Sequence, residues 1–386
     1  MIPINRPLVD DAEVQALASV VQSGWLSQGA RVAEFETAFA RNVGATHACA
    51  VSSCSAALHL ALLAAGVGPG DEVITVSYSF IAGANVARLC GAVPVFVDID
   101  PVTFNIDPLK LETAISNRTR AILCVDQVGM PCDLASIVAI ARPRGLVVIE
   151  DAACAVGSQI HFDGAWEPIG APQADIACFS FHPRKIITTG EGGMLTTKRT
   201  DWDRGFRLLR QHGMTVDAAE RHQSSKVMFE SYESSGFNYR MTDLQAAIGL
   251  EQLRKLPEIV RRRRALAESY ANMLAKIPDV SPPHEPTWAR SNWQSYCVRL
   301  PPWAEQESIM QTMLDHGIAT RRIRCAHLES AYSNYPVRYS LAYSEDAHRH
   351  CLLLPLFPQM TEEMQQKVIV ALDTALKEQR KPRMAG

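Results

Sequence analysis

Short apolar runs typical of β-strands recur along the first half of the chain. Helical patterns such as Ser55–Ala65, Ile81–Cys90 and Leu109–Ile115 lie between several of them. Strands that alternate with helices predict an α/β fold with a mostly parallel sheet covered by helices on both faces. The strand-like runs are His47–Ser52, Glu72–Val76, Val93–Asp98, Ala121–Asp126, Leu146–Glu150, Ala174–Phe181 and Gly193–Thr197.

The pattern becomes helical after Asp243, which suggests a second domain. The amphipathic segment Leu244–Leu256 is followed by a long charged helix, predicted from Pro257 to about Lys276. We therefore predict a large domain over residues 1–250, with an N-terminal arm, and a small α+β domain over residues 251–386. The small domain is expected to contain a linker with four prolines (Pro278–Trp288), a strand (Ser295–Leu300) and two helices (Gln306–His316 and Thr361–Lys377).

Composition and charge fit a globular protein of two domains. A chain of 386 residues is longer than a single core usually supports, and 47% hydrophobic with 20% charged residues is ordinary usage. The 38 basic and 41 acidic residues give a net charge of −3, which provides no global positive field for nucleic acid or anionic membranes. We therefore expect neither as a partner.

The cysteines and the N-terminus indicate a cytoplasmic protein. Several of the ten cysteines lie singly in apolar runs and none forms a metal-type cluster, so we expect buried, reduced thiols and no metal site. The N-terminus has no apolar core behind a basic start. No apolar stretch approaches the roughly 18 to 20 residues of a membrane-spanning helix.

The most informative motif is Ser180–Gly193, which contains Lys185. It joins two predicted strands through a turn in which three glycines permit close approach of a ligand. A lysine amine there can condense with a cofactor aldehyde, be displaced by an amino substrate, and then move a proton. Burial and nearby positive charge would lower its pKa and supply the reactive neutral amine. The alternative is a surface lysine in a polar loop.

Two other strand ends could complete a site for such a cofactor. Asp151 follows Leu146–Glu150, and a carboxylate there can keep a pyridine nitrogen protonated so that the ring accepts electrons. Ser55 stands where a strand passes into a helix, whose first amides suit a phosphate. The alternatives are a metal-binding or helix-capping aspartate and a serine that only caps its helix. Since loops leave a parallel sheet at one edge, we expect Asp151 and Lys185 to meet.

Motifs along nearly the whole chain carry a family resemblance. They are Ser23–Gly29, Phe35–Glu36, Gly66–Glu72, Phe96–Asp100, Glu150–Ala153, the Lys185 stretch, Asn238–Met241 and Leu354–Pro358. In this order they resemble the fold-type-I, pyridoxal-phosphate-dependent nucleotide-sugar aminotransferases of DegT type, which include perosamine-synthase-like enzymes. The resemblance implies a mostly parallel seven-stranded sheet sandwiched by helices, with a smaller α+β C-terminal domain.

The resemblance also implies roles for individual residues. Lys185 would form a Schiff base with pyridoxal 5'-phosphate, and Asp151 would hold its pyridine nitrogen. Phe80 would cover the ring, unless it is a core aromatic. Asn238 would reach the phosphate in the neighbouring subunit of a homodimer with shared active sites, unless it is only a turn residue. The phosphate ligands would be Ser180, Ser55 and the Ala56 amide.

Three positions depart from the family pattern. Cys54 replaces a usual Gly, and Cys154 replaces a Gln or His that would lie near the ring hydroxyl of the cofactor. Asp126–Gly129 replaces a motif that more often begins with His. These departures affect cofactor hydrogen bonding and substrate choice but leave the chemistry of Lys185 and Asp151 intact.

Two basic runs have open interpretations. Arg261–Arg264 lies in a predicted helix, where consecutive residues spread over different faces, and is predicted to form a solvated or interface surface. Arg321–Arg324 lies in the small domain, where related enzymes shape the substrate pocket. Its arginines would suit a diphosphate or a carboxylate, with a solvated loop as the alternative.

The function that the resemblance implies is transfer of an amino group from an amino acid, L-glutamate, to a nucleotide-diphosphate keto sugar, with a 4-keto-6-deoxy hexose as the first choice. A keto-cyclitol aminotransferase of antibiotic biosynthesis has the same fold and lysine. A sugar dehydratase of the family has His in place of the lysine, so Lys185 argues against it. A non-catalytic regulatory protein on this fold would need neither Lys185 nor Asp151.

Overall fold

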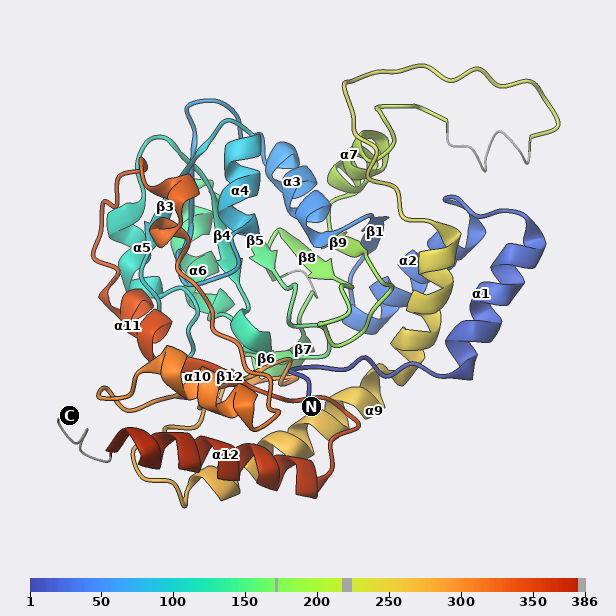
Figure 1. Cartoon of the computed structure of the whole chain (residues 1–386). Coiled ribbons are helices and arrows are strands. Elements are labelled where there is room, and N and C mark those ends of the chain that lie inside the picture. Colours follow the sequence, from blue (N-terminus) through green and yellow to red (C-terminus); the bar gives the residue numbers. More distant parts are fainter. Residues whose placement is uncertain (171–172, 217–223, 381–386) are drawn as a thin grey trace.

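A computed structural model describes residues 1–170, 173–216 and 224–380 and has a seven-stranded sheet at its centre (Figure 1). Strands β2 to β5 and β8 pair in parallel, whereas β9 pairs antiparallel with β8 and β1. The prediction of a mostly parallel seven-stranded sheet is confirmed. In spatial order the strands are β1 (His47–Val51), β9 (Gly193–Thr197), β8 (Ile176–Ser180), β5 (Val147–Asp151), β4 (Thr119–Val125), β2 (Glu72–Val76) and β3 (Val93–Val97).

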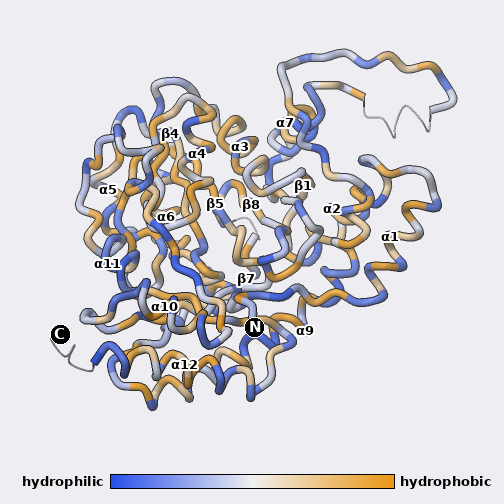
Figure 2. Tube along the Cα trace, viewed as in Figure 1, coloured by the Kyte–Doolittle hydropathy of each residue, from blue (hydrophilic) through white to orange (hydrophobic). Residues whose placement is uncertain are grey.

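In the first half of the chain, α2 to α7 pack around this sheet, whereas α1 lies further out and packs on the long helix Asp243–Leu274 (Figure 1). Seven of the eleven residues of α3 are buried, because the helix packs against β8 and β9. The α3 ribbon is accordingly mostly hydrophobic (Figure 2). These helices are α1 (Asp11–Ser23), α2 (Ala30–Val43), α3 (Cys54–Ala64), α4 (Ala82–Leu89), α5 (Pro108–Ala114), α6 (Leu134–Ala141) and α7 (Thr200–Leu209).

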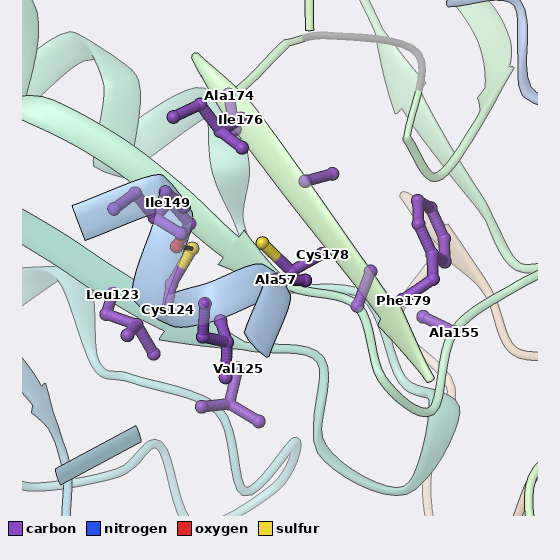
Figure 3. Close-up of a cluster of buried hydrophobic side chains, with 14 of the residues drawn as sticks. Ala57, Leu123, Cys124, Val125, Ile149, Ala155, Ala174, Ile176, Cys178 and Phe179 are labelled. Atoms are coloured by element: carbon purple, nitrogen blue, oxygen red, sulfur yellow. Dashed lines mark hydrogen bonds between the residues drawn. The ribbon is translucent and has the colours of Figure 1, made fainter. Parts of the chain in front are cut away.

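The sheet core is made by apolar side chains of the central strands. Figure 3 shows Leu123 and Val125 of β4 and Ile149 of β5 on the same side of the sheet as Ala57 of α3, whereas Phe179 of β8 points to the other side. Leu123, Ile149 and Phe179 have no exposed surface. Burial on both faces explains why these strands are continuous apolar runs in the sequence.

One long helix, α9 (Asp243–Leu274), replaces the two consecutive helices predicted from the sequence. Pro257 lies inside it, and its missing N–H does not end the helix because both halves are packed. Leu256 and Ile259 belong to the core around the sheet, whereas Tyr270 and Leu274 belong to a second core. The predicted boundary at residue 250 remains a proposal, and the change of core occurs further along α9.

The second core lies beside one end of the sheet and is formed by the end of α9 together with β11, β12, α10 and α12 (Figure 1). A two-stranded sheet pairs β11 with β12, and α10 packs on α12. A separate three-stranded sheet, which the sequence analysis did not predict, joins β10, β6 and β7. The elements are β6 (Gln159–Phe162), β7 (Ala165–Pro168), β10 (Ala289–Arg290), β11 (Tyr296–Arg299), α10 (Gln306–Asp315), α11 (Ala342–His350), β12 (Cys351–Leu354) and α12 (Glu362–Arg380).

The four arginines at positions 261–264 do not share one environment. Arg261 and Arg262 are exposed and pair with Glu258, as predicted for a solvated surface. Arg263 is only 1% exposed, so the prediction is wrong for this residue. The helix turns about 100° per residue, which directs one member of any such run towards the interior.

None of the described helices has the length and apolar character needed to cross a membrane.

Candidate active site

Two neighbouring strands bring Asp151 and Lys185 to one cavity of about 360 Å³. Asp151 is the last residue of β5 and is paired in register with Cys178 of β8. Lys185 lies in the loop that follows β8. Both side chains border the cavity, as the sheet-edge prediction required.

The Lys185 amine faces a thiol and a carboxylate. Its Nζ lies 3.1 Å from Sγ of Cys154. Burial lowers the pKa of Lys185, but Cys154 and Asp151 raise it by more, so that the pKa lies above its ordinary value. The expectation of a lowered pKa is wrong for this arrangement, because the groups that face the amine are not cations.

Asp151 is buried and borders the cavity. The backbone N–H of Ala153 donates to Oδ1 at 3.1 Å, and Sγ of Cys54 lies 3.9 Å from the same oxygen. Burial raises the pKa of Asp151 and Lys185 opposes that shift. A cation beside this carboxylate, such as a protonated pyridine nitrogen, would stabilise the ionised form.

The start of α3 lies close to the strand ends because of a glycine. A Cβ at Gly193 would come within 2.5 Å of the Ser53 backbone, so no other residue fits there without a shift. Ser53 caps α3, and its Oγ accepts the Ala56 N–H at 3.1 Å. Ser55 is exposed and borders the cavity, whereas Ala56 does not. A phosphate would have to replace Ser53 as the partner of the Ala56 amide.

Two further predicted residues border the same cavity. Ser180 ends β8 and is buried, and its Oγ accepts the His182 N–H at 3.5 Å. The Phe80 ring is 75% exposed, so it is not a core aromatic. Phe80, Lys185 and the buried Asp151 border the same cavity, which suits a planar ring with a polar edge. The donor set therefore fits pyridoxal phosphate.

Asn238 lies away from this group. It is exposed, does not border the cavity, and forms an antiparallel bridge with Gln211. It follows the described segment 224–236, which projects from the body of the protein as the yellow-green part of Figure 1. Val227 and Phe229 of this segment are 83% and 86% exposed. The predicted role of Asn238 in a second subunit stays a prediction.

The small-domain arginines are separated by the structure. Arg321 borders the cavity. Arg322 pairs with Glu307 at 3.1 Å, and Arg324 pairs with Glu329. Only the first arginine of the predicted group is therefore placed to contact a ligand in the cavity.

Two residues that the sequence analysis missed hold the lysine loop. Nδ2 of Asn5 donates to the Pro183 carbonyl at 3.0 Å, and Nε2 of Gln294 donates to the Arg184 carbonyl at 2.8 Å. Both also border the cavity. No local pattern could have identified them, because their partners are 178 and 110 residues away along the chain.

Known proteins of one aminotransferase family are similar to this chain over nearly its whole length. The model of the DegT/DnrJ/EryC1/StrS aminotransferase family matches residues 7–373. The spore coat polysaccharide biosynthesis protein SpsC of Bacillus subtilis is 38% identical over 387 aligned residues, which cover 97% of each chain.

Solved structures of aminotransferases have the same fold over nearly the whole chain. The aminotransferase TlmJ from Streptoalloteichus hindustanus has a TM-score of 0.89 at 33% identity and covers 98% of this chain and 99% of its own. The PLP form of Spr1654 from Streptococcus pneumoniae has a TM-score of 0.89 at 27% identity, with coverages of 98% and 99%.

Proposed function

The chain belongs to the DegT/DnrJ/EryC1/StrS aminotransferase family, and on that premise we propose that it transfers the amino group of L-glutamate to a keto sugar carried on a nucleotide diphosphate. It is a pyridoxal-phosphate-dependent sugar aminotransferase. The acceptor in the proposal is a 4-keto-6-deoxy hexose. The observation that carries the proposal is the approach of Lys185 and Asp151 from neighbouring strand ends into one cavity.

Lys185 and Asp151 have different roles in the proposed reaction. Lys185 would hold the cofactor through its amine and, once released from it by the amino substrate, would accept and return a proton at Nζ. Asp151 holds the pyridine nitrogen, and its burial strengthens that interaction. Pyridoxal phosphate, when bound, supplies the electron-accepting ring that transamination needs.

The other cavity residues orient the cofactor. Ser55 and Ser180 would donate hydroxyl hydrogens to the phosphate, and the dipole of α3 would favour an anion at its start. Phe80 would cover the ring and exclude water from it. Cys154 lies beside the Lys185 amine and would be available to the ring hydroxyl, and Arg321 would bind the anionic end of a substrate.

Amino transfer is tested with purified protein, pyridoxal phosphate, L-glutamate and a panel of nucleotide-linked keto sugars and keto-cyclitols, with mass spectrometry of the products. We expect an aminated nucleotide sugar, and loss of the product in Lys185→Ala. The exposed Lys198 does not border the cavity, so Lys198→Ala is the matched control and should retain activity. Amination of a keto-cyclitol alone would establish the other substrate class, and no amination of any acceptor would contradict catalysis.

A homodimer with shared active sites is part of the proposal. Its support is the projecting segment with Val227, Phe229 and the 63% exposed Tyr232, since a row of exposed apolar side chains usually marks an interface. In the dimer, Asn238 reaches the cofactor phosphate of the second subunit. Sedimentation of wild-type protein and Phe229→Glu should show a dimer and a weakened dimer, whereas a monomeric wild type would contradict this arrangement.

We also propose a cytoplasmic location, which fractionation of cells that produce the protein would test.

A further inference from the structure

Arg263 is a buried cation without an acidic partner. It is 1% exposed, and within the described ranges no carboxylate lies at ion-pair distance from its guanidinium. Burial lowers its pKa to about 9, which still leaves the side chain charged at neutral pH. Its hydrogen bonds go to four neutral oxygens: the carbonyls of Trp293 (3.0 Å), Gln294 (3.1 Å) and Leu356 (3.0 Å), and Oδ1 of Asn5 (2.6 Å).

Two of these partners continue to the lysine loop. Asn5 binds Arg263 through its side-chain oxygen and the Pro183 carbonyl through its side-chain nitrogen. Gln294 binds Arg263 through its backbone carbonyl and the Arg184 carbonyl through its side chain. Each of the two carbonyls that directly precede Lys185 is therefore held by a residue that Arg263 itself holds.

We propose that Arg263 is a positioning residue of the amino-transfer site, which fixes the backbone before Lys185 through Asn5 and Gln294. The assignment rests on the proposed role of Lys185. It does not make Arg263 a catalytic residue, because its guanidinium does not border the cavity.

The geometry explains why an arginine occupies this position. A guanidinium offers five donors in a rigid plane and can bind several segments at once, whereas an ammonium is a point charge on a flexible stem. The segments that meet here are the N-terminal arm, the stretch before β11, and the stretch after β12. Hydrogen bonds from a charged donor are stronger than neutral ones, so the bonds from Nη1 and Nη2 offset part of the cost of the buried charge, while Nε has no hydrogen-bond partner among the described residues.

Arg264 provides a matched control on the same helix. It is half-buried and also binds main-chain carbonyls, those of Ser291 at 2.9 Å and Arg290 at 3.4 Å. No hydrogen bond in the described part of the chain joins either of these residues to the lysine loop. Arg264→Met therefore removes an equivalent side chain and leaves the connection to Lys185 intact.

Amide hydrogen exchange of the cofactor-free protein tests the proposal directly. The Lys185 N–H donates to the His182 carbonyl at 2.8 Å, so its exchange rate reports the order of the loop. Arg263→Met should accelerate exchange of peptides that contain Lys185 by roughly tenfold or more, because charge-assisted hydrogen bonds are lost. Strand β4 should be unaffected, Arg263→Lys should recover part of the protection, and Arg264→Met should match the wild type.

A second test of the positioning role measures the absorbance and the kinetics of the protein loaded with pyridoxal phosphate. We expect Arg263→Met to shift the pH at which the visible absorbance of the bound cofactor changes, and to lower kcat more than it raises KM for glutamate. Unchanged exchange at Lys185, or acceleration spread evenly over the sheet, would overturn the positioning role.

A variant that does not fold and a failure of the proposed function would each be recognised separately. If Arg263→Met does not fold, the double variant Asn5→Ala and Gln294→Ala keeps the three carbonyl bonds of Arg263 and should loosen the same loop. The exchange experiment contains no substrate, so failure of amino transfer would contradict the proposed function without affecting this result.

Discussion

Two buried arginines of this protein are held in opposite ways. Arg210, 4% exposed, donates to Oε1 of Glu36 at 2.5 Å and to the Ala50 carbonyl at 2.7 Å. Glu36 also accepts from Arg207 at 2.7 Å. Arg263, by contrast, binds neutral oxygens alone within the described residues.

The difference indicates that the Arg210 region stabilises the fold, whereas the Arg263 region positions the loop that contains Lys185. Around Arg210 the charges are neutralised, and the bonds tie α2, β1 and α7 together away from the cavity. Burial raises the pKa of Glu36, but Arg210 and Arg207 lower it by more, so the carboxylate is ionised at neutral pH. Around Arg263 the charge organises main-chain carbonyls beside the lysine loop. We expect changes at the first region to affect folding, and changes at the second to affect Lys185.

The largest effect should come from Glu36→Gln. It leaves Arg210 buried without its counter-charge, which typically costs about 3–5 kcal/mol of unfolding free energy. Denaturant titration measures the loss, and exchange at Lys185 relative to the global rate should not change. Glu34→Gln is the control, because Glu34 lies on the same helix in an exposed pair with Arg31 and should cost about 0–1 kcal/mol. Equal losses in the two variants would contradict the comparison.

Asp126 extends the comparison to a buried acid that pairs with no arginine in the described part of the chain. It has no exposed surface, and burial raises its pKa to about 7. The pKa of Asp126 is higher in the folded protein than its ordinary value of 3.8. Its contribution to folding stability is therefore complete below pH 3.8 and is lost as the pH rises through about 7. Glu36, with a lowered pKa, contributes in the opposite sense and loses its contribution as the pH falls.

Asp126→Asn cannot ionise, so the variant should lose less stability than wild type between pH 5 and pH 8. The direction follows from the raised pKa of Asp126, whose ionisation depends on that of the buried Glu150 beside it. Denaturant titrations of the cofactor-free protein at both pH values provide the measurement. Parallel pH profiles of wild type and variant would show that Asp126 ionises normally.

Asn5→Asp makes the Arg263 region resemble the Arg210 region. The carboxylate keeps an acceptor for Arg263 but removes the donor to the Pro183 carbonyl. We expect the unfolding free energy to stay within about 1 kcal/mol of wild type, because the new ion pair offsets the lost bond. Exchange at Lys185 should accelerate and amino transfer should slow. A variant with unchanged transfer would show that the Asn5 bond to the loop is dispensable.

The smallest effect should come from Arg261→Ala. Arg261 is on the same helix as Arg263 but is exposed and pairs with Glu258 three residues earlier. Such pairs contribute little in water. The unfolding midpoint and the amino-transfer rate should both match wild type, and a clear loss of either would mean that this surface has a partner.

The sequence predicted the sheet well because its strands are buried on both faces and therefore continuously apolar. All seven predicted strands are present, two of them with identical bounds, Glu72–Val76 and Gly193–Thr197. The sequence predicts a helix start at Pro257, whereas packing on both sides continues α9 through this residue. The β6–β7 hairpin was missed because its residues are partly exposed and show no clear apolar run.

The candidate site could be predicted only where strand ends determine it. Asp151 and Lys185 meet because parallel neighbours end at one edge, and the family membership and the cofactor are confirmed. The individual roles of the site residues stay predictions. Arg263 could not be distinguished from its three neighbours, since only tertiary packing decides which member of a run turns inward.

The residues that hold the loop before Lys185 are far apart along the chain, which has a consequence for folding during synthesis on the ribosome. When Lys185 emerges, Asn5 is already present, but Arg263, Gln294 and Leu356 have not been made. The central sheet can therefore form before the backbone beside the reactive amine is held in place. The backbone before Lys185 is therefore fixed only after Arg263, Gln294 and Leu356 have been made, and we expect a translation arrest before Gln294 to leave the strands of the sheet complete and the Lys185 loop without these bonds.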